Sequence, residues 1–388
     1  MPDAVIVAAA RTPIGRALKG SLVDVHAGDL GAIAIRGVLD QVPAVDPATI
    51  DDVVVGAANL VADQNWLFAR IVTALAGLPD TVPGINVSRG CASSLEAIRI
   101  AAEAVKAGSG DTYLAVGVEQ CSHTNGKGIE MADLHPRLFD KTRDDFLCDM
   151  YLPMGITAEK VAKRFGVTRE RMDEFAKLSH DRAVAAQQAG FFDREIVPVP
   201  LPDGTLFTKD ECPRPNASVE SLAALSPSFK KDGVVTAGNS CPLNDGGAAV
   251  MVMSEERAHE LGLQPLVRIR SWATTGLAPE IMGVGPIEAV RKALEQAKMT
   301  LDDVDVVELN EAFASQVLAV CDELGIDIDE QLNPHGGAIA LGHPFGMTGA
   351  RIMTTLINDL QTLDKEIGVE TMCVGTGMGV AMVVERMS

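Results

Sequence analysis

Aromatic side chains are scarce in this sequence, since 2 tryptophans, 2 tyrosines and 11 phenylalanines make up only 4% of its 388 residues. Hydrophobic residues nevertheless reach 47%, with 15 methionines among them. A chain of this length buries a large core, and here alanine, aliphatic side chains and methionine must fill it, as in sheets that helices cover. No apolar run reaches the roughly 20 residues of a membrane-spanning helix, so no membrane insertion is expected.

Basic residues are also in short supply. There are 33 lysines and arginines against 53 acidic side chains, which gives a formal net charge of −20. This balance argues against a general nucleic-acid-binding or membrane-surface protein, because such a protein needs a basic face. It leaves room for an anionic ligand, since a few local cations and helix N-termini are enough to hold phosphate groups.

Cysteine patterns typical of disulfide frameworks or metal centres are missing. The seven cysteines show no CxxC or Cys/His ligand spacing, so neither structural disulfides nor a metal site is predicted. The opening run "MPDAVIVAAARTPIGR" has Asp3 before a short apolar stretch and no basic segment. This favours a buried strand over a signal peptide, and a reducing, cytoplasmic location is expected.

What the chain does contain is an internal repeat. Three segments of one half resemble three of the other in the same order: "IDDVVVGAAN" (50–59) and "LDDVDVVELN" (301–310), then the turns and helical runs at 88–108 and 342–360, then the apolar stretches at 112–120 and 370–386. Strands that alternate with helices predict an α/β sheet in each half. Two similar halves suggest a duplication, with a site where their matching loops meet.

The composition changes between the two copies. Residues 121–246 alternate helical runs with proline-rich segments, which indicates an insertion that emerges from the first half. We therefore predict an N-terminal half at 1–120 that is completed by 247–267, an inserted loop domain at 121–246, and a C-terminal half at 268–388.

Cys91 is the first candidate for chemistry. It follows Gly90 at the expected start of an amphipathic helix that Gly108 would end. The unpaired N–H groups and the dipole at a helix N-terminus favour thiolate over thiol. The alternative is a buried structural cysteine, which is what most cysteines are.

Three further candidates occupy turns or strand ends. His343 lies between Gly342 and Pro344 at the equivalent point of the second half, where a histidine can act as a general base for a thiol. Cys373 ends a strand before the glycine turn "GTGMG", whose backbone N–H groups can bind an oxyanion. Asn310 ends another apolar strand. Taken singly, each is better explained as a structural histidine, an ordinary glycine-rich turn or a turn asparagine.

Taken together, these motifs resemble one family along nearly the whole chain. The matching blocks are "VIVAAARTPIGR", "PMGITAEKVAKRFG", "TAGNSCPLNDGGAAVMVMSEE", "ELNEAFASQ", "NPHGGAIALGHPFGMTGAR" and "CVGTGMG". The sequence is similar to the thiolases, enzymes that cleave or form 3-ketoacyl-CoA. The resemblance implies a five-layered α/β/α/β/α thiolase fold, an acyltransferase with a ping-pong mechanism, and a homo-oligomer, either a dimer or a homotetramer.

The resemblance also assigns catalytic roles. Cys91 would take the acyl group as a thioester, and His343 would accept the proton of Cys91 and later help to bind the thioester oxygen. Asn310 would hold a water molecule that completes this first oxyanion hole. Cys373 would act as acid and base, and the backbone amides of Cys91 and Gly375 would form a second hole.

Coenzyme A is implied as a co-substrate, with no tightly bound cofactor. By the same resemblance Arg214 and Ser221 would lie near its adenine and phosphate end. Met154 would belong to the loop over the acyl pocket, with Phe313 beside it. Cys241 stands where thiolases usually have a serine that contacts the pantetheine arm, and a thiol donates a weaker hydrogen bond than a hydroxyl.

Less specific sequence features bear on the direction of the reaction. Pro153 replaces a histidine typical of biosynthetic members, which favours fatty-acid β-oxidation: cleavage of 3-ketoacyl-CoA to acetyl-CoA and a shortened acyl-CoA. "IRSWATTG" (269–276) is closer to biosynthetic members, so condensation of two acetyl-CoA by an acetyl-CoA acetyltransferase is the alternative. A non-catalytic acyl-CoA-binding or lipid-transfer relative, and a subunit of a β-oxidation complex, are further hypotheses. His335 also departs from the family pattern and is interpreted as structural.

Overall fold

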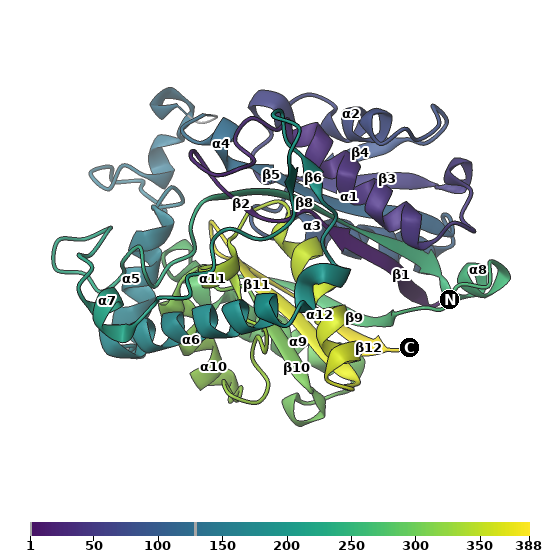
Figure 1. The fold of residues 1–388 in the computed structure, drawn as a ribbon. Helices are drawn as coiled ribbons and strands as arrows, with labels where there is room; N and C mark the ends of the chain where they lie inside the picture. The colour runs from purple at the N-terminus through teal and green to yellow at the C-terminus, as the bar shows by residue number, and fades with distance from the viewer. Residues whose placement is uncertain (1, 128–129) are drawn as a thin grey trace.

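The computed structural model describes residues 2–127 and 130–388 (Figure 1). Most strands form one mixed sheet, in the order β10-β11-β12-β9-β1-β8-β5-β3-β4, with β2 paired to β8. The strands are β1 (Ala4–Arg11), β2 (Gly15–Arg16), β3 (Asp52–Gly56), β4 (Gly84–Val87), β5 (Thr112–Gln120), β8 (Asn244–Ser254), β9 (Val267–Gly276), β10 (Val306–Leu309), β11 (Ile367–Val374) and β12 (Met378–Arg386). A separate ribbon joins β6 (Val199–Pro200) and β7 (Leu206–Phe207).

The sheet consists of two similar halves that meet at β1 and β9. The order β1-β8-β5-β3 in one half matches β9-β12-β11-β10 in the other. Within these matching orders β3 with β5 and β10 with β11 are parallel, and the other neighbours are antiparallel. The additional edge strand β4 of the N-terminal half also pairs parallel with β3. The halves touch through the short pairing of Val5 with Arg268 and Ile6 with Val267. The predicted strand–helix–strand repeat is therefore present.

Helices cover the sheet in layers. They are α1 (Ala27–Gln41), α2 (Phe68–Leu75), α3 (Ser93–Ala107), α4 (Cys121–Thr124), α5 (Met154–Phe165), α6 (Arg169–Gln188), α7 (Val219–Ala223), α8 (Glu255–Glu260), α9 (Gly285–Ala297), α10 (Ala314–Leu324), α11 (Ala338–Leu341) and α12 (Thr348–Thr362). Figure 1 shows α1 and α2 on one outer side and α9 and α10 on the other. Between the two half-sheets, α3 packs against α12, which completes the five layers.

The middle layer depends on small residues at the helix contact. A Cβ at Gly349 of α12 would lie 2.3 Å from the backbone nitrogen of Leu95 in α3, so only glycine allows this approach. The surrounding core is aliphatic, with Ile98, Ile352 and Leu356 fully buried. This packing holds the N-terminal ends of α3 and α12 together.

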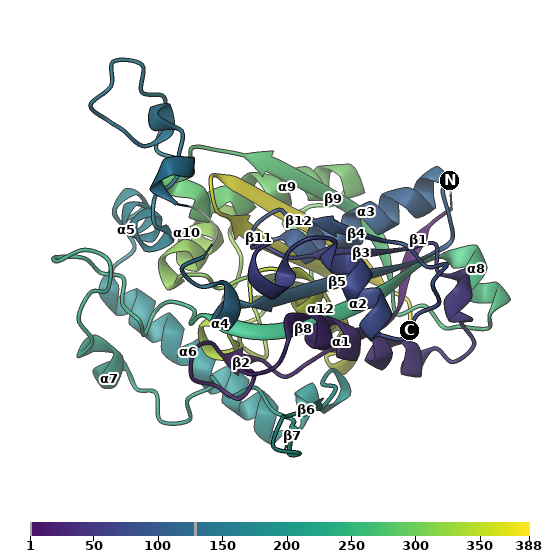
Figure 2. The same cartoon turned by 90° about the horizontal axis from the view of Figure 1, so that it is seen from above.

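The inserted segment packs mainly on the second half. Its helices α5 and α6 contact α10, and α6 also contacts α11, while Val161 and Phe175 belong to the core cluster of the C-terminal half. In Figure 2 the stretch 131–151 before α5 stands away from the layers. Strand β8 begins at Asn244, which lies before the predicted boundary at residue 246. Asn244 already pairs with Arg16 of β2, and pairing with β5 begins at Asp245.

The apolar stretch 370–386 is two strands in the structure. β11 ends at Val374 and β12 begins at Met378, since Thr376 and Gly377 take φ values of 68° and 93° that turn the chain. In the part of the chain that the structure describes, no helix is both long and apolar enough to cross a membrane.

Candidate active site

Cys91 lies on a tight turn just before α3. The helix begins at Ser93, two residues later than the sequence suggests, with Ala92 as its N-cap. Gly90 has φ of 51°, and the Ser93 hydroxyl closes the turn by donating to the Gly90 carbonyl at 2.6 Å and accepting from the Arg89 amide at 3.0 Å. Cys91 is thus presented at the end of the helix rather than inside it.

His343 occupies the matching turn before α12. Gly342 takes φ of 112°, and a Cβ there would lie 2.6 Å from the Asn244 side chain. The amide of His343 donates to Asn244 Oδ1 at 2.9 Å. The amide of Ala350 in α12 donates to Ser94 Oγ in α3 at 2.8 Å. Because the two helices are fastened at their first turns, the turns of Cys91 and His343 lie at the same end of the middle layer.

Hydrogen bonds define which nitrogen of His343 carries the proton. The Thr348 hydroxyl donates to the Pro344 carbonyl at 2.8 Å, so it must accept from His343 Nδ1, 2.7 Å away. Nε2 is then the unprotonated nitrogen. Burial, with a smaller contribution from Arg351, lowers the pKa of His343 to about 3, which keeps the imidazole neutral and able to accept a proton.

Asn310 stands beside that nitrogen. Its amide continues the β10–β11 pairing by donating to the Thr371 carbonyl at 3.0 Å, and its side-chain Nδ2 lies 3.3 Å from His343 Nε2. Asn310 is fully buried, and its Oδ1 meets no hydrogen-bond partner among the described residues. The side chain therefore combines a donor aimed at the histidine with an acceptor suited to a water molecule.

Cys373 and Gly375 come from the turn between β11 and β12. Cys373 is 1% exposed and packs with Phe313, while Met154 lies against the same cluster. The backbone of Gly375 lies close enough to the thiol of Cys91 to act against the rise of its pKa. A Cβ at Gly375 would lie 3.3 Å from Met154 Sδ, so the space above this amide is narrow.

The thiols of this site are protonated at rest. Packing around Sγ raises the pKa of Cys91 to about 11, an effect that Glu119 increases and the N–H groups of Gly375 and Cys91 itself only partly offset. The prediction that the helix N-terminus would favour thiolate is therefore wrong, because the loss of solvent outweighs the backbone donors. Burial and the neighbouring Cys91 likewise raise the pKa of Cys241 and of Cys373.

The predicted coenzyme A contacts divide into two groups. Met154 begins α5, Phe313 is the N-cap of α10, and Cys241 donates its amide to the Ala312 carbonyl at 3.1 Å, so these three gather around the thiols. Arg214 and Ser221 are exposed on the inserted segment. Ser221 forms a capping box with Ser218 at the start of α7.

Several residues that support the site were absent from the sequence prediction. Thr348 orients His343, Asn244 holds its backbone, and the buried Glu119 accepts from the Gly346 amide at 2.9 Å. Asn244 and Thr348 fall inside motifs that the sequence makes conspicuous, yet only the folded contacts reveal what they bind. The outcome is a buried neutral base, two protonated thiols and backbone donors at one end of the middle layer.

Comparison with known proteins identifies this arrangement. The family models "Thiolase, N-terminal domain" and "Thiolase, C-terminal domain" match residues 4–256 and 263–386. The chain is 45% identical to the 3-ketoacyl-CoA thiolase of Bacillus subtilis (strain 168), over 99% of this chain and 100% of that protein. It is 44% identical to the acetyl-CoA acetyltransferase of Cupriavidus necator, over 100% of both.

A solved structure agrees. The crystal structure of human mitochondrial 3-ketoacyl-CoA thiolase in complex with CoA superimposes with a TM-score of 0.90 at 35% identity, covering 100% of this chain and 98% of that one. With both family models matched and relatives similar over their full length, this chain belongs to the thiolase family and is an acyltransferase with the thiolase fold.

Proposed function

We propose that the chain cleaves 3-ketoacyl-CoA with coenzyme A, giving acetyl-CoA and an acyl-CoA shortened by two carbons. The observation that carries this proposal is the pairing of a protonated Cys91 thiol beneath the Gly375 amide with a neutral His343 whose Nε2 is free to accept a proton. Breaking a carbon–carbon bond beside a ketone needs a nucleophile, an acid for the departing carbanion, and donors where negative charge develops.

In the first half-reaction Cys91 passes its proton to His343 Nε2 and its sulfur attacks the 3-keto carbon. The oxyanion is held by the protonated His343 and by a water molecule on Asn310. The bond between C2 and C3 then breaks, its electron pair forms the enolate of acetyl-CoA, and the Cys373 thiol protonates that carbon. Acetyl-CoA leaves, and the acyl group stays on Cys91 as a thioester.

In the second half-reaction the Cys373 thiolate takes the proton of the incoming coenzyme A thiol, which attacks the thioester. The backbone amides of Cys91 and Gly375 hold the negative oxygen of this tetrahedral intermediate. The Cys91 thiolate departs and recovers its proton from His343. Both cysteines finish in the state in which they began, so no external oxidant or reductant is required.

Binding of coenzyme A is assigned to residues from the inserted segment and α10. Met154 and Phe313 would flank the reactive end, Cys241 would contact the pantetheine arm, and Arg214 with Ser221 would meet the adenine and phosphate end. The exposure of Arg214 and Ser221 suits groups that remain near solvent. Coenzyme A is a co-substrate in this scheme, and no tightly bound cofactor takes part.

Degradative thiolysis is preferred over acetoacetyl-CoA synthesis on a local feature. Pro153 is the N-cap of α5, directly before Met154, and offers no ring nitrogen or other side-chain donor to an acyl oxygen. Condensation of two acetyl-CoA is the second candidate, because relatives of both names are equally similar in sequence. A β-oxidation partner subunit belongs to the first candidate, in which this chain would receive 3-ketoacyl-CoA from a dehydrogenase.

The oligomer is expected to form through the edge of the N-terminal half. Trp66, Leu67 and Ile71 are 85%, 63% and 40% exposed around α2, and Ile85 on the neighbouring edge strand β4 is 48% exposed. An exposed apolar patch beside an open strand edge is suited to a second copy of the chain. A cytoplasmic site of action is proposed as well, in keeping with seven cysteines that are all unpaired.

The test measures loss of acetoacetyl-CoA and of a long-chain 3-ketoacyl-CoA in the presence of coenzyme A. Cys91→Ala should abolish both reactions and the acyl-enzyme adduct seen by mass spectrometry. Cys373→Ala should fail to release acetyl-CoA from 3-ketoacyl-CoA, because the departing enolate then lacks its acid. Preference for the long chain supports the degradative assignment, whereas turnover of acetoacetyl-CoA alone supports the acetyltransferase. Full activity in Cys91→Ala would refute the mechanism.

A further inference from the structure

Glu311 follows Asn310 in the chain but takes no part in the steps above. It is 1% exposed, and both of its carboxylate oxygens accept hydrogen bonds. Oε1 accepts from Asn333 Nδ2 at 2.9 Å, and Oε2 accepts from the Ser179 hydroxyl at 2.6 Å and from the Ile339 amide at 3.1 Å. Burial raises the pKa of Glu311, and the hydrogen bonds from Ser179, Asn333 and Ile339 oppose that rise. The carboxyl group is therefore held by donors at both of its oxygens.

The partners of Glu311 belong to the segment that leads into His343. Ile339 lies in α11, which ends two residues before His343. A Cβ at Gly337 would lie 2.3 Å from Glu311 Cδ, and the Gly337 amide donates to Ser179 Oγ at 3.3 Å. The carboxylate therefore fastens the approach to the base.

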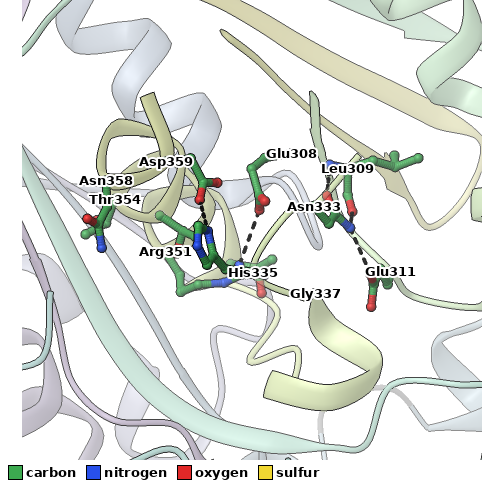
Figure 3. Close-up of polar contacts among 12 residues, drawn as sticks. Glu308, Leu309, Glu311, Asn333, His335, Gly337, Arg351, Thr354, Asn358 and Asp359 are labelled. Atoms are coloured by element: carbon green, nitrogen blue, oxygen red, sulfur yellow. Dashed lines mark hydrogen bonds and ion pairs between the residues drawn. The ribbon is translucent and has the colours of Figure 1, made fainter. Parts of the chain in front are cut away.

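The same segment also holds the strand that carries Asn310. The side chain of Asn333 acts as an additional strand partner: its Oδ1 accepts from the Leu309 amide and its Nδ2 donates to the Leu309 carbonyl, both at 2.9 Å. Figure 3 shows Asn333 between Leu309 and Glu311. The residues immediately before and after Asn310 are thus bound by one side chain of the segment that carries His343.

We propose that Glu311 is a positioning residue for thiolysis, which sets the distance between Asn310 and His343 by clamping the 333–342 segment, with Ser179 of α6 as a second support. This inference rests on the proposed function, because the clamp is assigned to Asn310 and His343, and His343 is the proposed acceptor of the Cys91 proton. A displacement of about 1 Å in a catalytic group is enough to cost about a hundredfold in rate.

The experiment compares Glu311→Ala, Glu311→Gln and Ser179→Ala with Glu195→Gln as a matched control. Glu195 is also buried, at 2% exposure, and binds Arg11 and Asn358, so its loss destabilises a buried network whose hydrogen bonds do not include Glu311 or Ser179. Each variant is measured for kcat, for KM of coenzyme A, for melting temperature, and for the rate at which iodoacetamide alkylates Cys91 between pH 7 and pH 11.

We expect kcat to fall about a hundredfold in Glu311→Ala, less in Glu311→Gln, and least in Ser179→Ala, with KM of coenzyme A little changed. Alkylation of Cys91 should be slowed in Glu311→Ala at pH 7.5, where His343 must take the proton. At high pH the rate should match that of the unmodified protein, because hydroxide then removes the proton directly. Glu195→Gln should lower the melting temperature without slowing the alkylation of Cys91 at pH 7.5.

Equal losses of kcat in Glu311→Ala and Glu195→Gln, or slow alkylation at every pH, would overturn the inference and leave Glu311 a purely structural residue. Failure of the proposed function is distinguishable: the unmodified protein and Glu195→Gln would then show no thiolysis at all, while alkylation would still report whether Glu311 positions the base. If Glu311→Ala does not fold, Glu311→Gln and Ser179→Ala supply the same comparison.

Discussion

The two duplicated halves share a backbone but differ in what they bury. In the N-terminal half β3 reads Asp-Val-Val-Val-Gly and places only apolar side chains in the sheet interior. The matching strand β10 carries the buried Glu308 and leads into Asn310 and Glu311. At this strand the first half thus buries only apolar side chains. The second half supplies polar groups, which must be held in place by other buried polar groups.

The fourth residue of each middle-layer helix shows the same contrast. In α3 it is Glu96, which pairs with the partly exposed Arg89 and Arg99 near the surface. In α12 it is Arg351, which is 1% exposed and lies 3.8 Å from the equally buried Glu308. The two helices occupy equivalent positions because the halves are duplicated. The more deeply a charge is buried, the more the stability of the fold depends on its ion-pair partner.

The largest expected effect links the halves directly. His343→Ala should lower kcat/KM for thiolysis by about a thousandfold or more, in the upper range for loss of a general base. Because Cys91 and His343 act as one unit, adding Cys91→Ala to His343→Ala should cost little beyond Cys91→Ala alone. Steady-state kinetics on the two single variants and the double variant measure this coupling. Losses that multiply would show that the two turns act independently.

The next largest effect concerns stability. Arg351→Met should destabilise the fold by about 3–5 kcal/mol, because it leaves Glu308 as an unpaired buried carboxyl. Glu96→Gln, at the same helix position in the other half, should cost about 1 kcal/mol or less, because its arginine partners keep access to water. Urea unfolding of both variants provides the comparison. Similar losses of stability in Arg351→Met and Glu96→Gln would contradict the claim that the more deeply buried charge depends more on its partner.

Much of this contrast could be anticipated from the sequence, and part of it could not. The repeat, the glycines before Cys91 and His343, and the strand ends at Asn310 and Cys373 are local patterns, so they predicted an α/β sheet in each half and the candidate residues. The five-layered fold and the catalytic roles came from the resemblance to the thiolases. The clamp of Glu311 depends on Ser179 and on residues 22 to 28 positions further along the chain, and no local pattern carries such contacts. The raised pKa of the Cys91 thiol likewise arises from packing that forms only in the fold.

A smaller, pH-dependent effect is expected at Glu370, which lies opposite Glu308 on β11. Its carboxyl oxygens meet no partner among the described residues, and burial raises its pKa well above the usual value. Above the unfolded pKa the folded state binds the proton that the unfolded state has lost, so this group lowers stability as pH rises, by about 1.4 kcal/mol per pH unit.

Glu370→Gln removes this titration while keeping the size of the side chain. The variant should match the unmodified protein near pH 5 and become the more stable of the two by about 1–3 kcal/mol near pH 8, as measured by urea unfolding at both values. Glu96→Gln serves as the control. Burial alone would raise the pKa of the Glu96 carboxyl, but its contacts with Arg99 and Arg89 lower it below the usual value. This variant should therefore show no gain in stability at high pH. A gain that is the same at both pH values would mean that Glu370 does not hold a proton.

The smallest expected effect concerns Cys241, which the inserted segment places beside the thiols of the site. This thiol lies close enough to Cys91 to have its pKa raised by it, yet the proposed mechanism moves no proton through it. Cys241→Ser replaces a weak donor with a stronger one of similar size, so KM for coenzyme A should change while kcat stays within about threefold, less than 1 kcal/mol in the barrier. Steady-state kinetics with varied coenzyme A separates the two constants. A collapse of kcat would place Cys241 among the reacting groups and give the site a third working thiol, contributed by the inserted segment.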